Sequence, residues 1–106
     1  MKYFFSILLL LVTNLVNAEG MEFHHGTWDE ALAKSKASGK LIFMDAFTTW
    51  CGPCKRMSAQ TFPLKEVGEF YNANFINVKM DMEKGEGLML AGKYGVDSYP
   101  TLLYID

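Results

Sequence analysis

Two cysteines, Cys51 and Cys54, stand where an apolar, strand-like run passes into a helix-like one. The run at residues 41–47 is almost wholly apolar and rich in strand-forming side chains, which is typical of a buried parallel strand. Pro53, between the cysteines, fits a helix only in its first turn, where its missing N–H costs no hydrogen bond. We therefore expect a helix that begins at Cys51 and runs towards Phe62, directly after the strand.

This placement suits thiol chemistry, because two cysteines separated by two residues can close a disulfide across one helical turn. The unpaired N–H groups and the dipole at a helix N-terminus favour the thiolate of Cys51, and a thiolate is the species that attacks disulfides. Cys54, one turn further in, would be shielded and would act second by resolving the mixed disulfide. Gly52 allows a substrate chain to approach closely, and Pro53 stiffens the turn. The motif therefore predicts thiol–disulfide exchange.

The N-terminal stretch has the pattern of a secretory signal peptide. A positive start is followed by the almost wholly apolar residues 3–12, and small or apolar side chains suit cleavage after Ala18. An uncleaved membrane anchor is the alternative, but a spanning helix needs about 20 apolar residues and Asn14 interrupts this run. We expect residues 1–18 to be a signal peptide and residues 19–106 to form a periplasmic or secreted domain, with no stable membrane insertion after cleavage.

Other roles for the cysteine pair stay open at this point. A zinc site usually needs four ligands and no second cysteine pair exists; His24 and His25 could complete the site, although adjacent side chains point apart. A purely structural disulfide would close too small a loop to stabilise the fold much. Inert thiols are disfavoured in a compartment that permits disulfides.

The composition is that of one small globular domain, with 106 residues of which 50% are apolar and 21% charged. The net charge is −2, and the 10 lysines and arginines are scattered along the chain. Proteins that bind nucleic acid through their charge carry a clustered basic surface instead. We therefore expect no nucleic acid among the partners.

Helix-like and strand-like segments alternate along the chain, which predicts a layered α/β fold. Residues 21–24 are a weak strand candidate. Thr27 and Glu30 form a capping box, which predicts a helix that begins at Trp28 and ends at Gly39. The inward face of this helix is expected to comprise Trp28, Ala31 and Leu32.

The second half of the chain continues the alternation. We expect helices at residues 64–71 and 87–94 and strands at residues 75–81 and 101–105. The helix at 87–94 should turn Leu88 and Ala91 inward. The chain stops at Asp106, directly after a strand, and an exposed apolar edge strand is a liability. We therefore expect the sequence to be part of a longer product.

Four stretches, at residues 47–55, 78–81, 93–96 and 99–102, resemble landmarks of the thioredoxin family in their usual order. The resemblance spans residues 41–106. The capped helix before it resembles the secreted branch that includes the periplasmic reductase domains of DsbD-type transporters. The resemblance implies a three-layer α/β/α sandwich with a mixed central sheet, whose last strand and helix have no counterpart in this sequence.

The resemblance also implies roles for residues outside the cysteine motif. Pro100 would be a cis proline that faces the disulfide, and the peptide bond from Tyr99 would pair with the substrate backbone. Asp45 would be a buried acid that takes a proton from the resolving cysteine, with Lys79 beside it. Trp50 would shield the site. The alternatives are an ordinary trans proline at Pro100, a satisfied strand-end acid at Asp45 and a solvated lysine at Lys79.

The Gly52-Pro53 pair resembles the reducing branch of the family, which implies a reductase of protein disulfides. Its redox group would be its own Cys51–Cys54 disulfide, with no other cofactor and no metal. A reductase outside the cytoplasm needs an electron donor, which we expect to be a membrane thiol transporter. The alternatives are a disulfide oxidase or isomerase, and a non-catalytic thioredoxin-like module of a longer chain.

Overall fold

The computed structural model describes residues 20–106, so the signal peptide expected at residues 1–18 lies outside the described residues. Within the described part, the strands β1 (Leu41–Phe47), β2 (Phe75–Asp81) and β3 (Thr101–Ile105) form one sheet in the order β2-β1-β3. The central strand β1 is parallel to β2 and antiparallel to β3, so the sheet is mixed.

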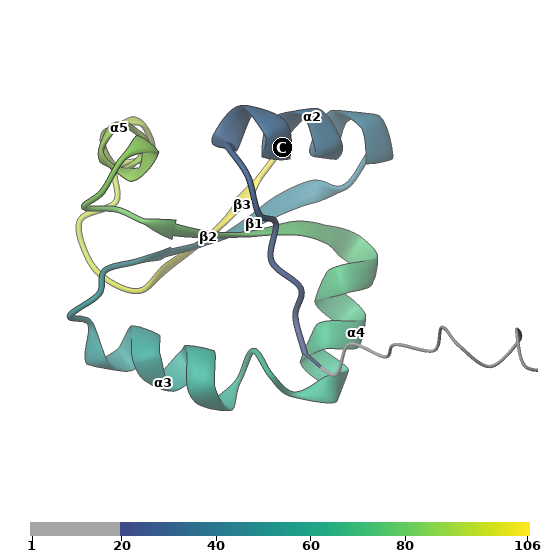
Figure 1. The fold of residues 1–106 in the computed structure, drawn as a ribbon, viewed down its shortest axis with the longest axis horizontal. Helices are drawn as coiled ribbons and strands as arrows, with labels where there is room; N and C mark the ends of the chain where they lie inside the picture. The colour runs from purple at the N-terminus through teal and green to yellow at the C-terminus, as the bar shows by residue number, and fades with distance from the viewer. Residues whose placement is uncertain (1–19) are drawn as a thin grey trace, which may run out of the picture.

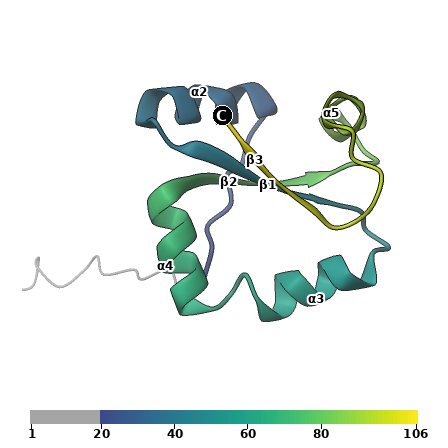
Figure 2. The ribbon, with the colours of Figure 1, turned by 180° about the vertical axis from the view of Figure 1, so that it is seen from behind.

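Among the described residues, two helices cover each face of this sheet (Figure 1). One face carries α2 (Trp28–Ser38) and α5 (Glu86–Tyr94), and the other carries α3 (Gly52–Gln60) and α4 (Lys65–Asn74). The view from behind shows the same separation into layers (Figure 2). The α/β/α sandwich with a mixed sheet is therefore confirmed.

Helix α2 begins with the expected capping box. The N–H of Glu30 donates to the Thr27 hydroxyl at 3.1 Å, and the N–H of Thr27 donates to Glu30 Oε1 at 2.7 Å. The bond from the Thr27 backbone, more than any other contact, lowers the pKa of the Glu30 carboxyl. The helix ends at Gly39, whose φ of 77° lies in the left-handed region that glycine enters without strain.

Two leucines expected to face inward are exposed, so the periodicity prediction was wrong for them. Leu32 is 40% exposed, whereas Trp28 and Ala31 of the same helix are buried. Leu88 is 63% exposed, whereas Leu90 is buried. A Cβ at Gly87 would lie 1.8 Å from the carbonyl oxygen of Asp81, so the first turn of α5 rests directly on the end of β2. This close approach turns Leu88 outward.

Residues 21–24 run beside the sheet without forming a strand, so the weak strand prediction was also wrong. The N–H of His24 donates to the carbonyl oxygen of Asn77 at 2.8 Å. The N–H of Met21 donates to the carbonyl oxygen of Phe62 at 2.9 Å. Two further contacts involve side chains: the N–H of Glu22 donates to Asn72 Oδ1 at 2.8 Å, and Asn77 Nδ2 donates to the Glu22 carbonyl at 3.3 Å. Asparagine side chains thus satisfy backbone groups that a regular ladder would otherwise pair.

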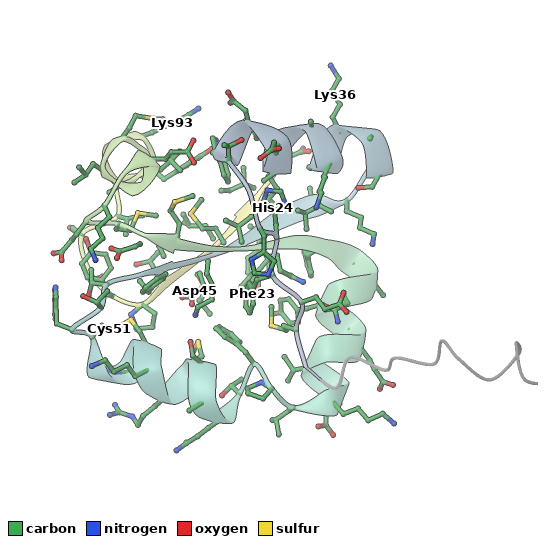
Figure 3. All side chains as sticks on the ribbon, in the orientation of Figure 1. Phe23, His24, Lys36, Asp45, Cys51 and Lys93 are labelled. Carbon is green, nitrogen blue, oxygen red and sulfur yellow. A yellow bond between two sulfur atoms is a disulfide. The ribbon has the colours of Figure 1, made fainter. Side chains whose placement is uncertain are left out.

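Strand β1 separates two kinds of core. Ile42 and Met44 pack into an aliphatic cluster under α2 and α5. Phe43 points to the opposite face, where its ring lies 4.9 Å from that of Tyr71 on α4. Asp45 shares this second face, because side chains alternate along a strand. The central strand therefore places a buried acid on the same side of the sheet as the cysteine helix (Figure 3).

None of the helices within residues 20–106 has the length and apolar character needed to cross a lipid bilayer. This finding concerns only the described part of the chain.

Candidate active site

The two cysteines form a disulfide at the first turn of α3. Their sulfurs are bonded, and their Cα atoms lie 5.3 Å apart. Cys51 is the N-cap of the helix, with extended backbone angles, and Pro53 lies in the first turn, as the sequence predicts. Each cysteine is 3% exposed, so Cys54 is shielded as expected and Cys51 is covered to the same degree in the disulfide state.

The start of α3 provides an electrostatic setting for a thiolate at Cys51. The N–H of Cys54 donates to Cys51 Sγ at 3.1 Å, which is a hydrogen bond to the atom that would carry the negative charge. The first turn of this helix, which the structure describes in full, contains no acidic side chain. Because a helix N-terminus carries partial positive charge, both features stabilise a thiolate there after reduction.

A pocket of about 440 Å³ opens beside the inner cysteine. Its walls come from the end of β1, from α3 and from β2. The side chains that line it include Cys54, Lys55, Ser58 and Lys79. The pocket therefore links the resolving sulfur to the lysine of β2, and Cys51 is not among its lining residues.

Asp45 and Lys79 meet directly across the sheet. They are register partners on β1 and β2, and Lys79 Nζ donates to Asp45 Oδ2 at 2.8 Å. The Asp45 side chain is 1% exposed, and that of Lys79 is 30% exposed. Asp45 Oδ1 is buried and accepts no hydrogen bond from any residue in 20–106. One carboxylate oxygen is thus held by an ammonium group, and the other is free to accept a proton.

Lys79 has further partners that hold its ammonium group in place. Nζ donates to Ser58 Oγ at 2.6 Å. It also lies over the rings of Phe47, Phe62 and Phe23, at 5.0, 5.1 and 5.4 Å from their centres. Distances of this size allow cation–π attraction. The lysine therefore occupies an aromatic cage that opens towards Asp45 and Ser58.

Trp50, which directly precedes Cys51, forms an aromatic rim with Tyr99. Trp50 is 64% exposed, its ring meets that of Tyr99 edge-on at 6.0 Å, and its Nε1 donates to Glu83 Oε1 at 2.9 Å. The Tyr99–Pro100 peptide bond is cis, as the resemblance implies. Trp50, Glu83 and Tyr99 come from three separate loops, which follow β1, β2 and α5 respectively.

The zinc alternative finds no support in this geometry. Both sulfurs belong to one disulfide, and His24 Nε2 contacts the carbonyl oxygen of Thr27 at 3.2 Å. Among residues 20–106, no three side chains of the metal-binding types gather at one point.

Sequence reasoning missed two residues of this site. Ser58 was not singled out, although it stands four residues after Cys54 and so shares its helix face. Glu83 follows the end of β2 in a turn, and no sequence pattern marks it as the partner of Trp50. The spacing within α3 could have indicated the first residue, whereas the second depends on tertiary folding.

Comparisons with known proteins agree with this geometry. A protein-family model described as thioredoxin matches residues 20–106. The solution structure of a proposed disulphide isomerase from Bacteroides thetaiotaomicron is 51% identical, with a TM-score of 0.72, and the match covers 85% of this chain and 74% of that one. A structure described as DsbH oxidoreductase is 25% identical, with a TM-score of 0.73, over 89% of this chain and 71% of that one.

A curated relative shows the same similarity at the level of sequence. Thioredoxin-1 of Drosophila melanogaster is 36% identical over 69 residues, which are 65% of this chain and 60% of the fly protein. The chain thus spans about three fifths of that relative's length. Since the family model covers the whole described part and the disulfide lies at its expected place, the chain belongs to the thioredoxin family.

Proposed function

We propose that this chain catalyses thiol–disulfide exchange and acts as a reductase of protein disulfides. The observation that carries the proposal is the disulfide at the start of α3, where Cys51 is the N-cap and its sulfur accepts the N–H of Cys54 at 3.1 Å. Once reduced, this sulfur has the surroundings that favour a thiolate, the reactive form.

In the first step, the Cys51 thiolate attacks one sulfur of a substrate disulfide. A bond forms between Cys51 Sγ and that sulfur, and the substrate S–S bond breaks. Its electron pair leaves with the second substrate sulfur, which takes a proton from solvent. Trp50 directly precedes Cys51 and its ring meets that of Tyr99, which forms the cis bond to Pro100. Gly52 and Pro53 are exposed between the cysteines, so we propose that these residues position the substrate chain.

In the second step, Cys54 resolves the mixed disulfide. Its proton passes to Asp45 Oδ1, the buried carboxylate oxygen without a hydrogen-bond donor among the described residues. The pocket that Cys54 lines reaches Lys79, the hydrogen-bond partner of this carboxylate, and solvent there would relay the proton. The Cys54 thiolate then attacks Cys51 Sγ, the bond to the substrate breaks, and the electron pair leaves with the substrate sulfur. The products are the reduced substrate and the Cys51–Cys54 disulfide.

The reducing direction is supported by the Gly52-Pro53 pair between the cysteines. Thioredoxin itself has a reduction potential of about −270 mV, whereas the oxidant DsbA lies near −120 mV. The pattern of residues 1–18 supports a periplasmic or secreted location, where a reductase would need electrons from outside the domain. We propose a membrane thiol protein as that donor.

Isomerase activity is the second candidate, because the Bacteroides thetaiotaomicron protein that is 51% identical is described as a proposed disulphide isomerase. An isomerase must let the substrate rearrange while it is bound to Cys51, before Cys54 acts. The two candidates therefore differ in the fate of the mixed disulfide. Recovery of activity by scrambled ribonuclease would favour isomerisation over net reduction.

The deciding experiment uses the full chain with insulin as substrate and dithiothreitol as reductant. We expect insulin reduction that is lost in both Cys51→Ser and Cys54→Ser variants. Equilibration with glutathione buffers should place the potential below about −200 mV, and a value above about −150 mV would contradict the reductase proposal and favour an oxidase. A wild-type chain that reduces no insulin would point instead to a non-catalytic interaction module.

A further inference from the structure

Helix α3, which begins at the cysteines, also carries a serine, Ser58, to which no role has been assigned so far. Ser58 lies on α3, four residues after Cys54, so the two side chains share one face of the helix. This face looks onto the sheet, because Ser58 Oγ accepts a hydrogen bond from Lys79 Nζ at 2.6 Å. Ser58 thus connects the helix of the resolving cysteine to the lysine that holds Asp45.

Ser58 and Lys79 together form a wall between two pockets. Both side chains line the pocket of about 440 Å³ that contains Cys54. Both also line a second pocket of about 490 Å³, bounded by Phe23 and Phe62. A lysine side chain is long and flexible, so the ammonium group could withdraw into either pocket if it were not tethered. The serine hydroxyl is the neutral hydrogen-bond partner that opposes this movement.

Lys79 is the positively charged partner of the buried Asp45 carboxylate. The ammonium group donates to Oδ2 at 2.8 Å, which leaves Oδ1 as the buried oxygen without a donor in the described part of the chain. Displacing the ammonium group would remove the charge that stabilises the carboxylate, because a buried acid depends on a close positive partner. Protonated Asp45 could no longer accept a proton from Cys54.

We propose that Ser58 is a positioning residue that holds Lys79 on Asp45 Oδ2 and thereby sets the pH range in which Cys54 resolves the mixed disulfide. This inference rests on the proposed function, since it concerns the second step of that reaction. The side-chain hydrogen bond of Ser58 is to Lys79, so in this proposal the serine acts through the lysine.

The charged groups that face Cys54 are limited in number. Lys79 and Lys55 line its pocket, from β2 and from α3, and Asp45 of β1 lies behind Lys79. Within residues 20–106, α2, α4, α5 and the segment at 20–24 contribute no side chain to this pocket. A change in the pH dependence of resolution can therefore be traced to these three groups and to the Cys54 thiol itself.

The test follows both steps in the reduced full chain with Ellman's reagent. Cys51 releases the first thionitrobenzoate when it attacks, and Cys54 releases the second when it resolves the mixed disulfide. In Ser58→Ala, the pH midpoint of the second release should rise by about 0.5–1 unit, because a less firmly held ammonium group stabilises the carboxylate less. At pH values below the wild-type midpoint the second release should slow about 3- to 10-fold, while the first release stays unchanged.

Matched variants separate positioning from a general effect on structure. Ser58→Thr keeps the hydroxyl and should retain the wild-type midpoint. Ser58→Val has the shape of the threonine variant without the hydroxyl and should show the same rise in midpoint as Ser58→Ala. The two pockets beside Ser58 provide space for the added methyl groups. Gln60→Ala, at an exposed position of the same helix, is the control and should leave both releases as in the wild type.

A double-variant comparison tests whether the serine acts through the lysine. In a Lys79→Met background, Ser58→Ala should cause no further shift. A shift that persists in that background would overturn the proposal, as would a wild-type midpoint in both Ser58→Ala and Ser58→Val. A wild-type chain that shows no second release would contradict the proposed function itself rather than the role of Ser58.

Discussion

Trp50 Nε1 donates a hydrogen bond to Glu83 Oε1 at 2.9 Å, which ties the residue before the first cysteine to the turn after β2. The indole is 64% exposed, yet it is also braced edge-on by Tyr99 at 6.0 Å. A large exposed ring held from two sides presents a fixed apolar surface next to the disulfide. Such preorganised surfaces lose little conformational entropy when a chain binds.

This brace predicts a role for Glu83 in substrate binding. Glu83→Ala should raise the KM for insulin about three- to tenfold with a smaller change in kcat, because the indole would no longer be held in one orientation. Glu83→Gln keeps an oxygen acceptor and should lie close to the wild type. Fluorescence anisotropy of Trp50, measured in a Trp28→Phe background, should fall in Glu83→Ala. Unchanged KM and anisotropy would show that the bond does not order the rim.

Asp45 is predicted to act in the second step alone. Asp45→Asn removes the proton acceptor, so release of the second thionitrobenzoate should slow about 100-fold, with the first release nearly unchanged. Asp97→Asn, which changes an exposed acid, is the matched control. Equal slowing of both releases in Asp45→Asn would indicate a damaged fold rather than a lost base.

The capping box of α2 predicts an acid-sensitive contribution to stability. The contact with Thr27 lowers the pKa of Glu30 below its ordinary value of 4.5 in the folded state. The stabilisation is therefore present above pH 4.5 and is lost as the pH falls through the folded-state pKa. Urea midpoints of the wild type and Glu30→Gln should differ at neutral pH and converge once the pH has fallen below the folded-state pKa of Glu30. A difference that stays constant with pH would contradict this role.

We expect the ionisation of Tyr104 to lower the stability of the fold at alkaline pH. Burial, and then its hydrogen bond with Tyr71 at 2.7 Å, raise the pKa of Tyr104 to about 12. Its contribution is therefore present below pH 10 and is lost as the pH rises through about 12. In Tyr104→Phe the fall in stability over this range should be shallower, whereas Tyr94→Phe should behave as the wild type. The same slope in all three proteins would argue against a role for the phenol pair.

The order of elements and the centre of the site could be predicted because the relevant patterns are local. Pro53 restricts the helix start, and the single acid in an otherwise apolar strand marks Asp45. Periodicity failed where a neighbouring element sets the rotation of a helix. At α5, the close approach of Gly87 to the end of β2 turns Leu88 outward. Periodicity also failed at residues 21–24, where isolated backbone hydrogen bonds and asparagine side chains take the place of a regular strand partner.

Two side-chain contacts between residues distant in the sequence were not predicted. The contact of Ser58 with Lys79 joins residues on α3 and β2 that lie 21 positions apart in the chain. The hydrogen bond from Trp50 to Glu83 spans 33 positions. Side-chain pairs of this kind form only after the sheet and its helices have packed, so no local pattern encodes them.

The most direct measurement concerns the acidity of the first cysteine in the reduced protein. Alkylation of Cys51 by iodoacetamide, followed against pH in a Cys54→Ser variant, reports the fraction of thiolate at that sulfur. Because the helix start and the N–H of residue 54 favour the thiolate, half of the maximal rate should be reached well below about pH 8.5, the value for free cysteine. A midpoint at or above about pH 8.5 would contradict a reactive thiol at this position.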